Sequence, residues 1–188
     1  MQKNKKINIL NLSNIVYIII IVCLSAFINS CEKREPVSQP EPAGIMKKIG
    51  EKFPENKELK EENITYESGK KSKELSEKAA ANLYSDDKYN PVDLSKIEKY
   101  SIIKNDGNSA VEIGIFKLYD KTNSEYVKKM AQTRISKLQS LNSKIKNTDM
   151  AKITNDAEIR SYGNYVYYVS HPQKDKIFKI IEDALRGV

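Results

Sequence analysis

The chain has 188 residues and a formal net charge of +7 at pH 7, with 11 tyrosines and no tryptophan. Its two cysteines are Cys23 and Cys31. A fold built from the residues beyond them would therefore contain no disulfide, no cysteine metal site and no cysteine nucleophile. This length is enough for one folded domain preceded by a shorter segment.

The first 30 residues have the pattern of a bacterial export signal. Three lysines, Lys3, Lys5 and Lys6, precede an unbroken apolar run over residues 15–24. A secretory signal has a basic start, about 7–15 apolar residues and small residues near the cleavage site. A membrane-spanning helix needs about 20 apolar residues, which is more than this run offers. We therefore predict a cleaved signal peptide over residues 1–30.

The segment Ile28-Asn29-Ser30-Cys31 resembles the lipobox of bacterial lipoproteins. In that family an aliphatic residue lies three positions before the cysteine and a small residue lies directly before it. The resemblance implies that Cys31 receives a diacylglycerol, becomes the new N-terminus and anchors the protein to the extracytoplasmic face of the cell membrane. Each buried CH₂ group adds about 0.8 kcal/mol to such an anchor. The alternative is an ordinary cleaved signal with an incidental cysteine.

Residues 31–70 are predicted to form a flexible, lipid-anchored linker. The first part of this segment, residues 32–44, contains three prolines among charged and small residues, Pro36, Pro40 and Pro42. Such a composition cannot bury enough apolar surface to offset the entropy of ordering. As a coil, the linker would span roughly 35 Å, from about 5–6 Å times the square root of its length. Ile45, Ile49 and Phe53 occur at helical spacing, which predicts only a transient amphipathic helix before Pro54.

Residues 71–188 are predicted to form an α+β domain that begins with a helix over residues 71–84, where apolar residues recur at helical spacing. Two strands follow, over residues 99–104 and 110–119. The sequence Asn105-Asp106-Gly107-Asn108 between them predicts a tight turn, because Asp and Gly tolerate the backbone conformations of hairpin turns.

The second half of the domain is predicted to repeat this pattern. Thr122-Asn123-Ser124-Glu125 has the form of a capping box, and an apolar stripe then predicts a helix to residue 145. Strands over residues 157–162 and 165–170 flank a two-residue turn. Pro172 in a first turn predicts the last helix.

The resulting order is α-β-β-α-β-β-α. We expect the two hairpins to join as one four-stranded antiparallel sheet, with the helices on one face. Val111, Ile113 and Ile115 would form the covered face. This is a two-layer α+β architecture.

Four parts of this domain resemble a small domain of lipoproteins from Firmicutes, catalogued as domain of unknown function 4358. They are the first helix over residues 71–84, residues 110–117, the long helix with Val127 and Arg134, and Gly163-Asn164-Tyr165-Val166. The resemblance spans about residues 71–187. It implies an envelope lipoprotein and brings no known catalytic residues.

Two residues are candidates for catalysis. Glu112 lies mid-strand with Gly114 as its neighbour on the same face, so that it could form the floor of a shallow site. The alternative is a glutamate on a solvated sheet face. His171 is the only histidine and precedes Pro172, which is typical of a helix cap or an exposed turn. A single histidine without other ligands makes a poor zinc site, and we predict no metal and no cofactor.

Tyrosines on the last hairpin are candidates for binding. Alternation places Tyr165 and Tyr167 on one face of the strand and Tyr168 on the other. Tyrosine combines flat apolar area with a polar tip, which suits contact with proteins or glycans. The alternative is strand propensity together with core packing. We predict an interaction surface formed by Glu112, Tyr165, Tyr167 and Tyr168.

Together these features predict a membrane-anchored extracytoplasmic lipoprotein that acts as a non-enzymatic binding module of the cell envelope. Its partners would be membrane lipid through Cys31 and an envelope protein or wall polymer. Nucleic acid is not expected outside the cytoplasm. One alternative is an envelope hydrolase that uses Glu112 or His171, and another is a structural spacer without a ligand.

Overall fold

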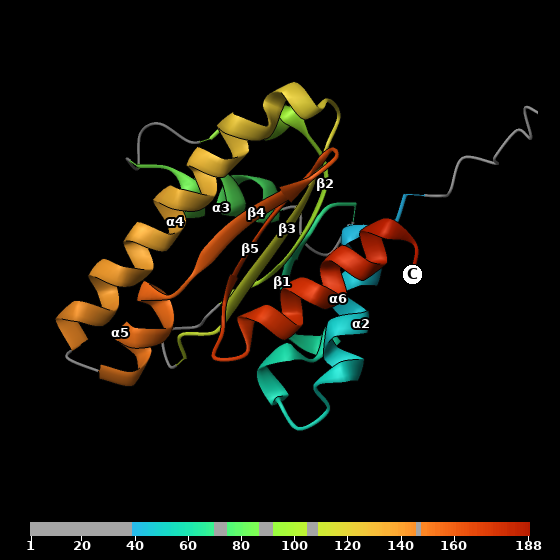
Figure 1. Cartoon of the computed structure of the whole chain (residues 1–188). Helices are drawn as coiled ribbons and strands as arrows, with labels where there is room; N and C mark the ends of the chain where they lie inside the picture. Colours follow the sequence, from blue (N-terminus) through green and yellow to red (C-terminus); the bar gives the residue numbers. More distant parts are fainter. Residues whose placement is uncertain (1–38, 70–74, 87–91, 105–108, 146–147) are drawn as a thin grey trace, which may run out of the picture. The chain divides into compact units, whose positions relative to one another are not determined.

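The computed structural model describes residues 39–69, 75–86, 92–104, 109–145 and 148–188 (Figure 1). The predicted signal peptide over residues 1–30, the predicted lipid-attachment residue Cys31 and the predicted turn at residues 105–108 lie outside the described residues. Within the described ranges, no helix is both long and apolar enough to cross a lipid bilayer.

A five-stranded antiparallel sheet forms the centre of the fold, in the order β1-β2-β3-β5-β4 (Figure 1). The strands are β1 Ile64–Glu67, β2 Ile97–Ile103, β3 Glu112–Leu118, β4 Glu158–Tyr162 and β5 Tyr165–Ser170. Both predicted hairpins are present, and they join through β3 and β5, where Ile115 lies opposite Tyr167. The α+β class is confirmed.

The predicted number of four strands is wrong, because β1 adds a fifth strand at the edge of β2. Tyr66 of β1 lies opposite Ile102 of β2. The sequence did not predict β1 because its four residues belong to the segment assigned to the linker.

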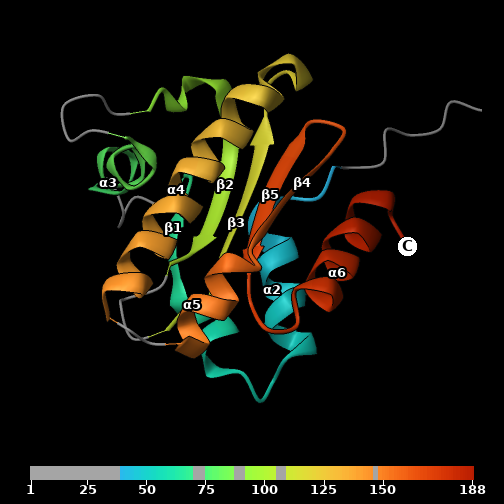
Figure 2. The ribbon, with the colours of Figure 1, turned by 60° about the vertical axis from the view of Figure 1, so that its left-hand side comes forward.

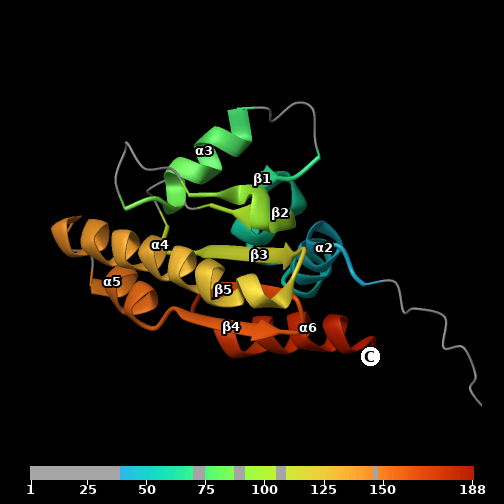
Figure 3. The ribbon, with the colours of Figure 1, turned by 90° about the horizontal axis from the view of Figure 1, so that it is seen from above.

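Helices cover both faces of the sheet, which corrects the predicted two-layer arrangement. The helices are α2 Pro42–Lys52, α3 Leu75–Tyr84, α4 Ser124–Ile145, α5 Thr148–Asn155 and α6 Lys174–Arg186. Figure 2 and Figure 3 show α2 and α6 on one side of the sheet and α3 and α4 on the other. The physical reason is that every residue of β3 is buried, so that both faces of the sheet require cover.

The first core lies between the sheet and the pair α2 and α6. Ile45, Met46 and Ile49 of α2 are buried there against Ile177 and Ile181 of α6. The folded unit therefore begins at Gln39, and the predicted linker over residues 31–70 is wrong from that residue onward. The spacing of the three apolar residues makes α2 amphipathic, and tertiary packing stabilises a helix that would be marginal in isolation.

The second core lies between the sheet and the helices α3 and α4. Tyr84 of α3 packs edge-on against Phe116 of β3, with ring centroids 5.5 Å apart. Val127 and Ile135 of α4 are buried in the same cluster. Phe116 faces away from Val111, Ile113 and Ile115, which belong to the first core.

The helix ends differ from the prediction in two details. Pro172 is not in the first turn of the last helix, because α6 begins at Lys174 and Pro172 lies in the turn before it. Asp120, and not Thr122, caps the turn that leads into α4, because its Oδ1 accepts the Thr122 backbone N–H at 2.8 Å. At the end of α6, Gly187 adopts a φ of 76°, a left-handed conformation that favours glycine.

Candidate functional site

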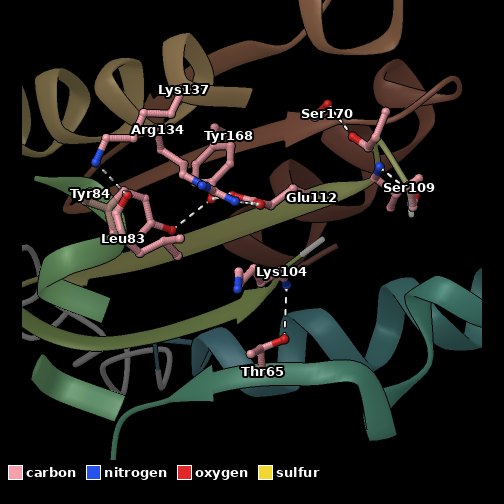
Figure 4. Close-up of polar contacts among 12 residues, drawn as sticks. Thr65, Leu83, Tyr84, Lys104, Ser109, Glu112, Arg134, Lys137, Tyr168 and Ser170 are labelled. Atoms are coloured by element: carbon pink, nitrogen blue, oxygen red, sulfur yellow. Dashed lines mark hydrogen bonds and ion pairs between the residues drawn. The ribbon is translucent and has the colours of Figure 1, made fainter. Parts of the chain in front are cut away.

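Glu112 points from β3 toward α4 and forms a bidentate ion pair with Arg134 (Figure 4). Arg134 Nε donates to Glu112 Oε1 at 2.7 Å, and Nη2 donates to Oε2 at 2.6 Å. The Glu112 side chain is 0% exposed. Paired donors of this geometry satisfy a buried carboxylate well. The predicted shallow site and the solvated sheet face at Glu112 are both wrong, since α4 covers this position.

Two tyrosines extend the pair across the second core. The Tyr168 hydroxyl donates to Glu112 Oε1 at 2.6 Å. Because its hydrogen is used there, Tyr168 accepts from the Tyr84 hydroxyl at 2.8 Å. Burial, with the charge of Glu112 adding to it, raises the pKa of both tyrosines well above the ordinary value. We name Glu112, Arg134, Tyr168 and Tyr84 the buried network.

The charge on Arg134 is maintained by its partner. Burial alone would lower the pKa of Arg134, but the hydrogen bonds and charge of Glu112 outweigh burial and raise it. The buried network therefore holds a charged pair in place between β3 and α4. Its four groups bind one another and so connect α3, α4, β3 and β5. This arrangement is typical of a network that stabilises the fold.

Lys137 of α4 fixes the end of α3 beside this network (Figure 4). Its Nζ donates to the Leu83 carbonyl at 3.4 Å and also to the Ser85 carbonyl. A cation at these carbonyls interacts favourably with the negative end of the helix dipole. Burial, assisted by the charge of Arg134, lowers the pKa of Lys137.

The predicted interaction surface is not at the surface in this fold. Tyr165, Tyr167 and Tyr168 are buried, as is Glu112. The Tyr165 hydroxyl donates to the Pro40 carbonyl at 2.8 Å, and the Tyr167 hydroxyl donates to Glu182 at 3.5 Å. The reason is that β5 lies between β3 and β4 and has helices on both of its faces. The three tyrosines are therefore core residues, which is the alternative to an interaction surface.

His171 lies at the end of β5, on the opposite side of the sheet from Glu112. Its ring contacts Phe53, which packs against the first core, at a centroid distance of 5.8 Å. Nδ1 accepts the Gln173 backbone N–H at 2.9 Å, and Nε2 lies 2.8 Å from Asn56 Nδ2. The imidazole thus accepts a backbone N–H in the turn before α6, and it is buried rather than exposed. Burial lowers its pKa.

An open groove of about 800 Å³ lies beside His171, between α5 and the turn that leads into α6. This is roughly twice the volume of the groove of about 390 Å³ beside Tyr84. Its lining combines apolar and charged side chains: Ala151, Ile153 and Pro172, with Asp149, Lys152 and Asp156. Sequence reasoning missed this groove because it assigned no helix to the residues of α5. We name it the α5 groove.

The α5 groove and the start of the folded unit lie at opposite ends of the sheet. Strand β5 begins at Tyr165, which contacts Pro40, and ends at Ser170, directly before His171. A molecule held near Gln39 would therefore leave the α5 groove accessible at the far end.

Among the residues that the structure describes, no three His, Cys, Asp or Glu side chains come together in a way that would hold a metal ion. No protein-family model, curated protein or solved structure matches the chain. The resemblance to the Firmicutes lipoprotein domain therefore stays a prediction.

Proposed function

We propose that this protein is an extracytoplasmic lipoprotein, anchored to the cell membrane through acylated Cys31, whose folded unit is a non-enzymatic binding module of the cell envelope. The observation that carries the anchor is the order of a basic start, an apolar run over residues 15–24 and the segment Ile28-Asn29-Ser30-Cys31. The proposed partner is an envelope protein or a wall polymer.

The anchor predicts that Cys31→Ser moves the protein from the membrane fraction to the soluble fraction, because two or more buried acyl chains hold a protein firmly where none would. The measurement is fractionation of cells, together with the mass of the mature N-terminal peptide. Cys23→Ser is the matched control and should remain in membranes. An unacylated Cys31 with the leader still attached would contradict the anchor.

The α5 groove is the surface that we propose for the ligand. It is open, lies away from Gln39 and presents apolar side chains beside charged ones, which is the composition of a binding site. His171 at its edge is held by the Gln173 N–H and contacts Asn56, so that this end of the groove has a fixed shape.

A bulky residue in the α5 groove should remove binding. We expect Ala151→Trp to abolish recovery of an envelope component that co-purifies with the wild-type protein from native membranes. Lys179→Trp places the same side chain on an exposed part of α6 outside the groove and should retain that component. Equal recovery by the two variants would rule out the groove, and the absence of any co-purifying component would favour the spacer alternative.

The geometry favours binding over the hydrolase alternative. Both carboxylate oxygens of Glu112 are engaged by Arg134, and one of them also by Tyr168. His171 lies across the sheet from Glu112 and cannot assist it. A hydrolase would require one of these groups to reach a substrate by itself.

A further inference from the structure

We infer that the end of the folded unit that contains Gln39 rests on the phospholipid surface, with the rings of Tyr119 and Tyr162 in the headgroup layer. This inference rests on the proposed anchor at Cys31 and deepens it, because it specifies which end of the module faces the lipid.

The length of chain between the anchor and the fold limits the distance to the bilayer. Seven residues, 32–38, separate Cys31 from Gln39. Even when fully extended, these eight Cα steps reach at most about 29 Å, at about 3.3–3.6 Å per residue. A lipid on Cys31 therefore keeps Gln39 close to the membrane surface, in place of the long linker expected from composition.

Contacts of neighbouring side chains fix the first residues of the unit to one end of the sheet. Asn164, in the turn between β4 and β5, donates through Nδ2 to Gln39 Oε1 at 3.2 Å and to the Leu118 carbonyl at 3.0 Å. Lys99 binds Glu41 at 2.8 Å. The position nearest the anchor is thus the end where β3 stops and the last hairpin turns.

The exposed apolar side chains gather at this same end. Tyr119 directly follows Leu118 and is 68% exposed, and Tyr162 lies two residues before Asn164 and is 43% exposed. Val188 is 84% exposed, and the Arg186 guanidinium before it lies over the Tyr162 ring at 5.6 Å. Figure 1 and Figure 3 show the C-terminus, the β4–β5 turn and the start of the described chain at this end.

The remaining exposed large apolar residue in the described part of the chain is Leu141, at 46%, near the other end of α4. It lies 17 residues after Ser124, the first residue of the helix. At about 1.5 Å per residue, that is roughly 26 Å along the helix axis. Leu141 is therefore a natural reference position on the side away from the lipid.

Tyrosine rings suit this location because they are amphipathic and collect where membranes meet water. Two lysines at this end are paired with carboxylates, Lys99 with Glu41 and Lys117 with Glu98 at 3.0 Å. The proposed contact is made by the rings, and uncharged lipid is the probe for it. The acyl anchor holds the module at a high local concentration beside the lipid. A weak contact of two rings is therefore sufficient to orient the module on the membrane surface.

Single tryptophans test this orientation, because the natural chain contains none. The probes are Y119W and Y162W in the full acylated protein, reconstituted into phosphatidylcholine vesicles with and without brominated phosphatidylcholine. We expect both probes to lose emission with the brominated lipid and to shift to shorter wavelengths relative to the detergent-solubilised protein. The control L141W should show neither change. Circular dichroism checks that each variant is folded.

The outcomes separate the orientation from the anchor. If the protein floats with the vesicles but Y119W and Y162W respond no more than L141W, the anchor stands and the orientation is wrong. A blue shift without quenching would indicate that another copy of the protein covers these rings and would also overturn the proposal. If the acylated protein does not float with the vesicles, the anchor fails and the orientation with it.

Discussion

Replacing Arg134 with methionine should reduce the free energy of unfolding by about 3–5 kcal/mol, because it leaves a buried charge without its partner. Glu112 is fully buried and accepts two hydrogen bonds from Arg134. Methionine fills much of the same volume but donates nothing, and only the Tyr168 hydroxyl remains of the donors described above. Urea unfolding of the purified protein measures the loss.

Two controls distinguish loss of the ion pair from general damage to α4. The double variant Glu112→Leu with Arg134→Met removes both charges and should recover most of the stability, since apolar replacements of buried pairs are often neutral. Lys128→Met breaks an exposed pair with Glu125 on the same helix and should cost at most about 1 kcal/mol. If R134M loses no more than K128M, the buried network does not stabilise the fold.

Gly114→Ala is expected to be the next most damaging change, at about 1–3 kcal/mol or more, because it overpacks a closed core. A Cβ at position 114 would overlap Cε1 of the Tyr168 ring and lie 2.9 Å from its Cζ. Gly114 lies opposite Tyr168 in the pairing of β3 with β5. The ring would have to move away, and its hydroxyl would leave Glu112.

The matched control is Gly44→Ala in α2, where an added Cβ meets nothing within 4 Å. Alanine is the better helix residue, and the change should leave stability equal or raise it by about 0.4–1 kcal/mol. Thermal unfolding of the two variants gives the comparison. Equal melting temperatures for G114A and G44A would show that the contact between Gly114 and Tyr168 is not tight.

The strands and hairpins could be predicted because their side chains alternate, and because Gly163 and Asn164 interrupt two such segments. The assignment of residues 39–69 failed for a different reason. Composition there is polar and rich in proline, and it outweighed the three apolar residues Ile45, Ile49 and Phe53. Those few residues are enough to hold the segment in the fold once α6 and the sheet bury them. The local composition does not reveal this burial, because it depends on residues far along the chain.

The buried network could have been predicted in part. Arg134 lies between Ala131 and Ile135 on the apolar side of a long helix, and Glu112 interrupts an apolar strand. Charged residues are almost never buried unless they are paired. A basic and an acidic residue at buried positions of the same domain are therefore expected to pair with each other. The α5 groove had no comparable signal, because it depends on how α5 packs beside the turn before α6.

The first core joins α2, near the start of the folded unit, to α6 at its end, and this has a consequence for the timing of folding. Ile49 and Ile181 share that core although 132 positions separate them. At about 5–20 residues per second, synthesis leaves α2 without its partner for on the order of 10 s. Because the first core cannot form before α6 has been synthesised, the chain stays unfolded until then. An unfolded chain is the form that can pass through a translocation channel.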